Sequence, residues 1–234
     1  MFWLATTRAV CLAVSLATAP LAMAAAPGTA AGPSAIEQAL ELYQRQDFAA
    51  AASAFERLSR VGVPAADYNL AVMHLRQELP QSSLPEAIRL MRRAADKGFV
   101  TAMVGLAQLH ERGDVDGRRD LAGAHQWHLK AAQAGSVEAQ LETATAFYLG
   151  RGAPKDMTAA AHWYREAAKR GDVGAQYLIA SMYETGLGVE RDLRLARYWY
   201  DLCARNGDVV AAAKLRALTP APEATAPAAA ASAP

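Results

Sequence analysis

The sequence predicts an all-α protein, a right-handed α/α solenoid (superhelix) of about five antiparallel helix pairs. Three observations support this prediction. Trp127, Trp163 and Trp199 are separated by 36 residues each. A glycine follows each tryptophan by eight residues, and an alanine follows each glycine by four: Gly135, Gly171 and Gly207, then Ala139, Ala175 and Ala211. A fixed period of this length is typical of repeat solenoids, in which each unit packs on its neighbours.

The same register extends toward the N-terminus and defines two helices in each repeat. The glycine column continues upstream as Gly98 and Gly62. A residue able to cap a helix stands where each second helix is expected to begin: Asp47, Ser83, Asp120, Asp156 and Asp192. The second helix is expected to end at the glycine, which readily adopts the left-handed conformation.

The first helices of the later repeats follow similar rules. Ser136, Asp172 and Asp208 come directly after the glycine and can cap the next helix. These helices are expected to end at glycine-rich connectors, 150–152 and 186–188, with a longer connector at 113–119. Paired small residues before each glycine column allow close helix crossing, and the tryptophan column is expected to fill the gap between neighbouring repeats.

These columns resemble the Sel-one-like repeat, a relative of the tetratricopeptide repeat. The resemblance is carried by residues 171–183, by the connector and cap at 186–192, and by 196–200, and the match covers about 47–218. The first full unit departs from the pattern, since Gln77 and Glu78 stand at the connector glycines. The second departs too, with Gly-Asp-Val-Asp from Gly113. The resemblance implies a helical scaffold that binds another protein or a peptide.

Residues 1–24 are expected to form a cleavable export signal. Arg8 is the only charge before residue 37, Pro20 ends an apolar stretch, and 22–24 reads Ala-Met-Ala, a small-residue cleavage pattern. The stretch is shorter than the roughly 20 residues of a membrane span. This favours a periplasmic or secreted protein, with no stable span after cleavage, over an uncleaved anchor. The other expected segments are a flexible lead at 25–34, the repeat domain at 35–218 and a disordered Ala/Pro-rich tail at 219–234.

Composition argues against several classes of protein. The formal net charge is +1, without the basic excess that nucleic-acid binding requires. After signal cleavage Cys203 is the single cysteine, so no internal disulfide is expected. Cys203 also falls in a column otherwise held by alanine, which favours a buried small residue over a nucleophile.

The histidines and glycines do not form a recognisable catalytic or metal-binding set. His125, His128 and His162 could bind a metal if they converged, but His162 falls on a different helical face. His74 and His110 occupy a column of aromatic residues and are expected to pack as aromatics. No connector carries the Lys-Ser/Thr of a phosphate loop. We therefore expect no enzyme activity, no metal and no cofactor.

The resemblance places the first helix of each pair on the concave side of the solenoid. Residues there vary between repeats while the packing columns do not. That is expected of a binding face, although drifting solvent-exposed positions would look the same. The mixture of Tyr, Leu and Glu suits a protein or peptide ligand. The predicted partner-binding residues are Tyr68, Val72, Gln108, Glu111, Glu138, Leu141, Thr145, Tyr148, Tyr177, Ser181 and Glu184.

The favoured function is an exported, non-catalytic, monomeric repeat scaffold that binds a protein or peptide in the bacterial cell envelope, as an adaptor, assembly factor or regulator. One alternative is an envelope hydrolase or a binder of peptidoglycan fragments. Relatives linked to such substrates are disulfide-rich, and this chain lacks paired cysteines. The other alternative is a passive structural spacer.

Overall fold

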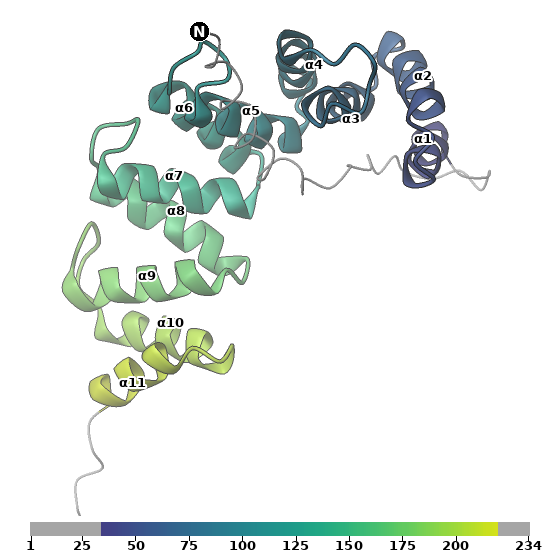
Figure 1. Cartoon of the computed structure of the whole chain (residues 1–234). Coiled ribbons are helices and arrows are strands. Elements are labelled where there is room, and N and C mark those ends of the chain that lie inside the picture. Colours follow the sequence, from purple (N-terminus) through teal and green to yellow (C-terminus); the bar gives the residue numbers. More distant parts are fainter. Residues whose placement is uncertain (1–33, 220–234) are drawn as a thin grey trace, which may run out of the picture. The chain divides into compact units, whose positions relative to one another are not determined.

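The computed structural model describes residues 34–219, and within that range every regular element is an α-helix (Figure 1). This confirms the predicted all-α class. The first helices of the successive pairs are α1 (Ala35–Gln44), α3 (Pro64–Leu75), α5 (Val100–Arg112), α7 (Val137–Leu149), α9 (Val173–Thr185) and α11 (Val209–Leu218). The second helices are α2 (Phe48–Arg60), α4 (Leu84–Asp96), α6 (Leu121–Gln133), α8 (Met157–Lys169) and α10 (Leu193–Arg205).

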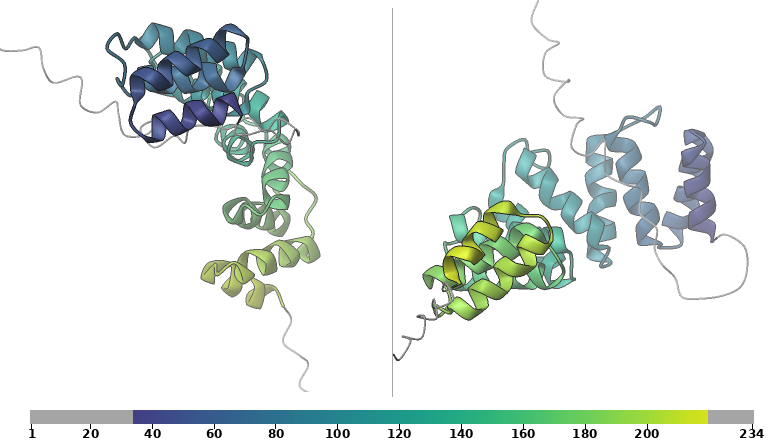
Figure 2. Two further views of the ribbon diagram at one scale, coloured as in Figure 1. Left: turned by 90° about the vertical axis from the view of Figure 1, so that its right-hand side faces the viewer. Right: turned by 90° about the horizontal axis from the view of Figure 1, so that it is seen from below.

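The helices belong to two compact units. Unit 1 extends to Asp156 and its described part holds α1–α7, whereas unit 2 begins at Met157 and its described part holds α8–α11. Within each unit, helices that follow one another in sequence pack together (Figures 1 and 2). None of the helices in 34–219 has the length and apolar character needed to cross a bilayer.

The helices begin at the predicted capping residues. Asp47 accepts a hydrogen bond through Oδ1 from the backbone amide of Ala50 at 3.1 Å, which satisfies an otherwise unpaired donor in the first turn of α2. Equivalent caps open α4, α6 and α10: Ser83, Asp120 and Asp192. Caps also open α7, α9 and α11: Ser136, Asp172 and Asp208. The fifth predicted start, Asp156, directly precedes α8.

The connectors contain two kinds of glycine. The first kind ends the helix in the left-handed conformation, as predicted: Gly113, Gly150 and Gly186. The second kind allows close packing. A Cβ added to Gly152 would overlap the carbonyl oxygen of Leu121, the first residue of α6, and one added to Gly188 would overlap that of Met157, the first residue of α8. The connector therefore lies directly against the start of the preceding second helix.

The core follows the small-residue columns, but the tryptophans are less buried than predicted. Trp199 is 7% exposed, whereas Trp127 and Trp163 are only partly buried. The more deeply buried column is the next residue in each repeat: Met91, His128, Tyr164 and Tyr200. Successive residues of a helix are rotated by about 100°, so this neighbour points into the core while the tryptophan lies at its edge. Cys203 is buried and free, as its column predicted.

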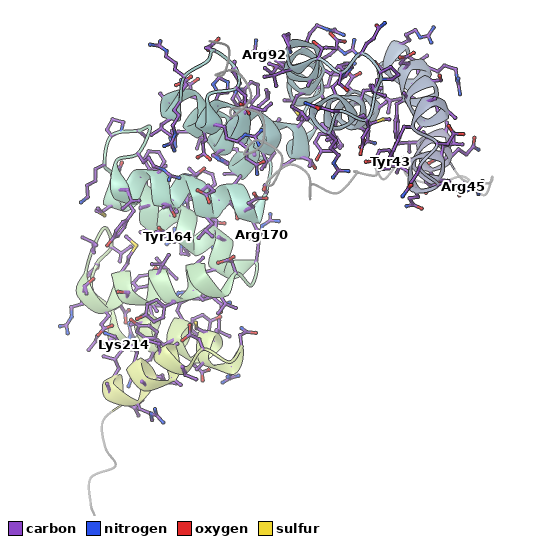
Figure 3. The ribbon with its side chains drawn as sticks, in the orientation of Figure 1. Tyr43, Arg45, Arg92, Tyr164, Arg170 and Lys214 are labelled. Atoms are coloured by element: carbon purple, nitrogen blue, oxygen red, sulfur yellow. The ribbon has the colours of Figure 1, made fainter. Side chains whose placement is uncertain are left out.

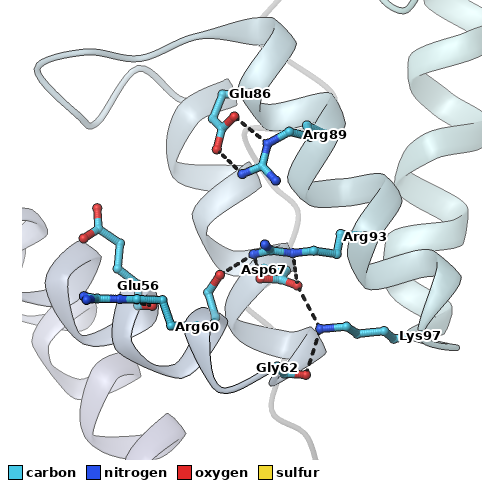
Figure 4. Close-up of polar contacts among 9 residues, drawn as sticks. Glu56, Arg60, Gly62, Asp67, Glu86, Arg89, Arg93 and Lys97 are labelled. Atoms are coloured by element: carbon cyan, nitrogen blue, oxygen red, sulfur yellow. Dashed lines mark hydrogen bonds and ion pairs between the residues drawn. The ribbon is translucent and has the colours of Figure 1, made fainter.

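A buried ion pair joins α2, α3 and α4 in unit 1 (Figure 4). Asp67 of α3 is fully buried and accepts a hydrogen bond through Oδ2 from Nε of Arg93 at 2.7 Å. Nη2 of Arg93 bonds to the other oxygen of Asp67 and to the hydroxyl of Ser59. Lys97 lies 3.7 Å from Asp67 and donates to the carbonyl of Gly62 at 3.0 Å. Since a buried charge without partners is costly, these two cations stabilise the carboxylate.

Candidate functional site

Two of the predicted partner-binding residues are core residues. Tyr68 is 1% exposed and Val72 is 0% exposed. Every residue of α3 from 65 to 73 is buried, because α3 packs against both α2 and α4. The ring of Tyr68 packs on that of Phe99, with their centroids 5.4 Å apart. The prediction that Tyr68 and Val72 face a partner is therefore wrong.

The other predicted positions lie on α5, α7 and α9 and remain accessible in part. Glu138 is exposed at the start of α7. The partly exposed positions are Gln108, Glu111, Leu141, Thr145, Tyr148, Tyr177, Ser181 and Glu184. We call these nine residues the first-helix surface, and each unit carries its own part of it: Tyr177, Ser181 and Glu184 belong to unit 2 and the other six to unit 1. The hydroxyl of Thr145 donates to the backbone carbonyl of Leu141 at 2.9 Å, a bond within α7 that does not involve the apolar side chain of Leu141.

In unit 1, Glu111 belongs to a polar cluster that the sequence did not predict. Nη2 of Arg151 lies 3.6 Å from Oε1 of Glu111 and 3.4 Å from Oε2 of Glu142, so one guanidinium holds two carboxylates from different helices. The buried imidazoles of His125 and His128 line the same small hollow. Nε2 of His128 is 3.8 Å from Oε1 of Glu111.

The ionisation of this cluster follows from its surroundings. Interaction with His128 is the largest influence on Glu111 and, with Arg151, holds the pKa of that carboxyl below its usual range despite partial burial. Burial, and secondarily the neighbouring His128, lowers the pKa of His125. The cluster therefore presents carboxylates and a guanidinium beside a neutral, buried His125 at neutral pH.

In unit 2, Glu184 belongs to a second cluster. The hydroxyl of Tyr200 donates to Oε2 of Glu184 at 2.7 Å, and Nζ of Lys214, labelled in Figure 3, lies 3.0 Å and 3.1 Å from the two carboxylate oxygens. The ring of Tyr177 meets that of Tyr200 edge to face, with 5.5 Å between centroids. Burial raises the pKa of Tyr200, and its hydrogen bond to Glu184 adds to that effect.

The two clusters use the same columns of the repeat. Glu111 and Glu184 stand at the same position near the end of a first helix, and His128 and Tyr200 stand at the same position after the tryptophan. Glu142 and Lys214 likewise share a position on the following first helix. The 36-residue repeat shows that these positions are equivalent. It does not show which repeat positions contact one another across helices, so the sequence alone could not predict the pairs.

Glu184 predicts a pH dependence for the stability of unit 2. Burial raises its pKa, but the hydrogen bonds from Tyr200 and Lys214 outweigh burial and lower the pKa overall. A lowered carboxyl pKa contributes stability that is present above the unfolded value of about 4.3 and is lost as the pH falls through the folded value. We expect Glu184→Gln to reduce the free energy of unfolding by about 1 kcal/mol at pH 7 and by less at pH 3, where the carboxylate begins to be protonated.

Urea denaturation followed by circular dichroism at both pH values measures this difference. Tyr200→Phe keeps the ring and removes one of the two donors to Glu184. The free energy of unfolding of this variant should therefore depend on pH less than that of the wild type and more than that of Glu184→Gln. If the wild type and Glu184→Gln differed in free energy of unfolding by as much at pH 3 as at pH 7, the ionised carboxylate of Glu184 would not be the stabilising group.

Other candidate chemistry receives little support from the geometry. Burial raises the pKa of the Cys203 thiol to about 11, so the reactive thiolate is scarce at neutral pH. Residues 34–219 contain no group of three or more His, Cys, Asp or Glu side chains placed to bind a metal.

Comparison with known proteins identifies a repeated sequence family. Residues 64–99, 100–136, 137–172 and 173–208 each match the sequence model of the Sel1 repeat, and together these matches span more than half of the chain. The first match begins at α3, so each copy comprises a first helix and the second helix after it. A comparison with curated proteins finds no match.

Two solved structures resemble the chain. One is the crystal structure of a Sel1 repeat protein from Oxalobacter formigenes, with 29% identity and a TM-score of 0.64, over 72% of this chain and 49% of that one. The other is a protective antigen present in uropathogenic Escherichia coli strains that displays an SLR fold, with 27% identity and a TM-score of 0.69, over 77% of this chain and 39% of that one. The chain thus spans less than half the length of either protein. With the consecutive helix pairs, these similarities confirm an α/α repeat fold of the predicted class.

Proposed function

Because the chain belongs to the Sel1 repeat family, whose repeats typically form scaffolds for protein interactions, we propose that it is an exported, non-catalytic scaffold that binds a protein or peptide partner in the bacterial cell envelope. In this role it would act as an adaptor, an assembly factor or a regulator. The observation that carries the proposal is the first-helix surface, whose side chains are accessible and differ between repeats while the surrounding alanine columns stay buried and constant.

The chemistry of this surface supports a protein or peptide rather than a small molecule as ligand. On α5 and α7 it combines the carboxylates of Glu111 and Glu138 with the aliphatic Leu141 and the aromatic Tyr148. Aromatic and apolar side chains beside charged ones are typical of protein interfaces, where they supply contact area and orientation together. The hollow beside Glu111 is small, and its lining is already engaged by Arg151.

A photo-crosslinking experiment tests the proposed surface. A photoreactive amino acid replaces the exposed Glu138 in one variant and the exposed Arg92, on the second helix α4 of the same unit, in the control. We expect a discrete crosslinked adduct in cells from the Glu138 position and none from Arg92. Equal crosslinking from both positions, or none from either, would contradict binding at the first-helix surface.

Export is proposed from the N-terminal sequence, which lies outside the described residues. The apolar stretch and the Ala22-Met23-Ala24 pattern support cleavage after Ala24. We expect the protein purified from the cell envelope or the medium to begin at Ala25, as measured by intact mass and N-terminal sequencing. Recovery of a chain that retains Met1 would contradict both the cleavage and the proposed location.

A further inference from the structure

A groove on unit 2 is lined by residues that do not belong to the first-helix surface. It has a volume of about 690 Å³, and its walls include Arg165 of α8, Tyr183 of α9, Val189 and Arg191 of the connector, and Leu193 and Leu195 at the start of α10. Leu193 is 36% exposed and Leu195 is 39% exposed. The groove thus combines apolar surface with three arginines, Arg165, Arg191 and Arg194, and two carboxylates, Glu190 and Asp192.

The repeat pattern explains why the start of α10 is uncovered. At the same position of the two preceding second helices, Leu121 and Met157 are each contacted by the second glycine of the next connector. Both are partly buried, whereas Leu193 is exposed. After α11, residues 34–219 contain no further connector that could cover Leu193. The start of α10 therefore presents a surface whose equivalents elsewhere in the chain bind an extended, glycine-containing segment.

The end of α11 is poorly suited to packing against another helix of the same kind. Arg216 of α11 stands in the column of Ala180, which is buried in α9. Arg216 is exposed. An arginine at a position that another second helix would bury opposes such packing, as expected at the polar end of a repeat array. A short extended segment on Leu193 would not need to cover Arg216.

The charges at the groove indicate what that segment should carry. Nε of Arg165 is buried and has no hydrogen-bond partner within the part of the chain that the structure describes. Nε of Arg191 donates to the backbone carbonyl of Glu184 at 3.0 Å, which holds the rest of its guanidinium at the groove. Two carboxylates also line the groove: that of Asp192 is engaged by backbone amides of α10 and by Arg194 at 3.2 Å, and that of Glu190 is exposed. Because three arginines outnumber these two carboxylates and Nε of Arg165 has no acceptor among the described residues, the groove favours a ligand that brings a carboxylate.

We propose that this groove binds an extended segment of a partner protein in which a glycine is followed closely by an acidic residue. The glycine packs over the backbone of Leu193, as Gly188 packs over Met157, and the carboxylate pairs with Arg165. This inference rests on the proposed protein-binding function, but it concerns a different surface of the molecule and a defined ligand chemistry.

The chain's own connector supplies a probe of that chemistry. An acetylated and amidated hexapeptide with the sequence of residues 185–190, Thr-Gly-Leu-Gly-Val-Glu, carries the glycine and a single carboxylate. Titration of the isotope-labelled full chain with this peptide, followed by NMR, should shift the amide signals of Leu193 to Leu195 in a saturable manner. A peptide with Glu190→Gln, and separately one with Gly188→Ala, should bind about tenfold more weakly.

Protein variants complete the test. Arg165→Gln should weaken binding of the wild-type peptide about tenfold, whereas Arg170→Gln, an equal change of charge at the exposed residue that follows α8, should leave it unchanged. Equal binding of the three peptides, or equal binding by Arg165→Gln and wild type, would overturn the proposal. Because the peptide variants leave the protein intact, the test holds even if Arg165→Gln does not fold.

The chain's own C-terminal segment is the other possible occupant of the groove, and a variant that ends at Thr219 tests it. If the peptide binds only after residues 220–234 are removed, the groove belongs to the chain's own C-terminal segment and the partner proposal is wrong. This titration requires no cellular partner, so its failure is separable from a failure of crosslinking at Glu138, which would instead contradict the first-helix surface.

Discussion

Replacing Arg93 by alanine is expected to lower the free energy of unfolding of unit 1 by about 3–5 kcal/mol. Arg93 supplies two of the contacts to the fully buried carboxylate of Asp67, and its removal leaves Lys97, 3.7 Å away, as the cation within ion-pair distance among residues 34–219. A buried carboxylate that has lost its main partner has neither solvent nor an adequate counter-charge. Urea denaturation at pH 7, followed by circular dichroism, measures the change.

The same helix offers a matched control in Arg89, which also binds a carboxylate through two nitrogen atoms (Figure 4). Its partner is Glu86, and the side chains of this pair are 55% and 38% exposed. Because exposed pairs are screened by water, Arg89→Ala should cost less than about 1 kcal/mol. Equal effects of the two substitutions would show that burial of Asp67 does not govern the stability of this region. Adding Asp67→Asn to Arg93→Ala should recover part of the loss, since it removes the uncompensated charge.

Gly188→Ala is expected to destabilise unit 2 by about 2–5 kcal/mol, through backbone strain and steric overlap together. Gly188 has a φ of +71°, a conformation that residues with a Cβ rarely adopt. The new methyl group would also overlap the backbone carbonyl of Met157, which cannot move aside as a flexible side chain could. Urea denaturation of the variant should show the loss as a lower midpoint.

Gly171 separates these two causes. It lies in the same unit with a φ of +91°, but a Cβ added there has no atom within 4 Å. Gly171→Ala should therefore cost only the strain, about 1–2 kcal/mol. If the two variants were equally stable, the connector would not pack against the start of α8. A glycine packed over Leu193 in the groove of unit 2 would then have no counterpart at Met157.

The helix pairs were predictable from the sequence because their signals are local or strictly periodic. A capping residue such as Asp47 bonds to an amide three residues later, so its effect needs no knowledge of the rest of the fold. The glycines at 113, 150 and 186 end helices through their own backbone conformation. The spacing of 36 residues then places equivalent residues in equivalent surroundings.

The first-helix surface was only partly predictable, because one column can be core in one repeat and surface in the next. Tyr68 and Tyr177 occupy the same column, yet Tyr68 is buried and Tyr177 is partly exposed. The local pattern around the two residues is alike. What differs is how the neighbouring helices cover them, which no periodicity within the chain describes.

By itself, therefore, the sequence determined the helices, their ends and the repeat that orders them, since these depend on contacts within a few residues and on a regular period. Tertiary structure alone decided that Asp67 is a buried charge held by Arg93, and that one arginine, Arg151, joins Glu111 to Glu142. It also decided that the second connector glycine is needed for its lack of a side chain, since Gly188 packs on Met157. The contacts of Asp67 with Arg93, of Glu111 with Arg151 and of Gly188 with Met157 join residues that are 26 or more positions apart, where packing geometry rather than local sequence brings the atoms together.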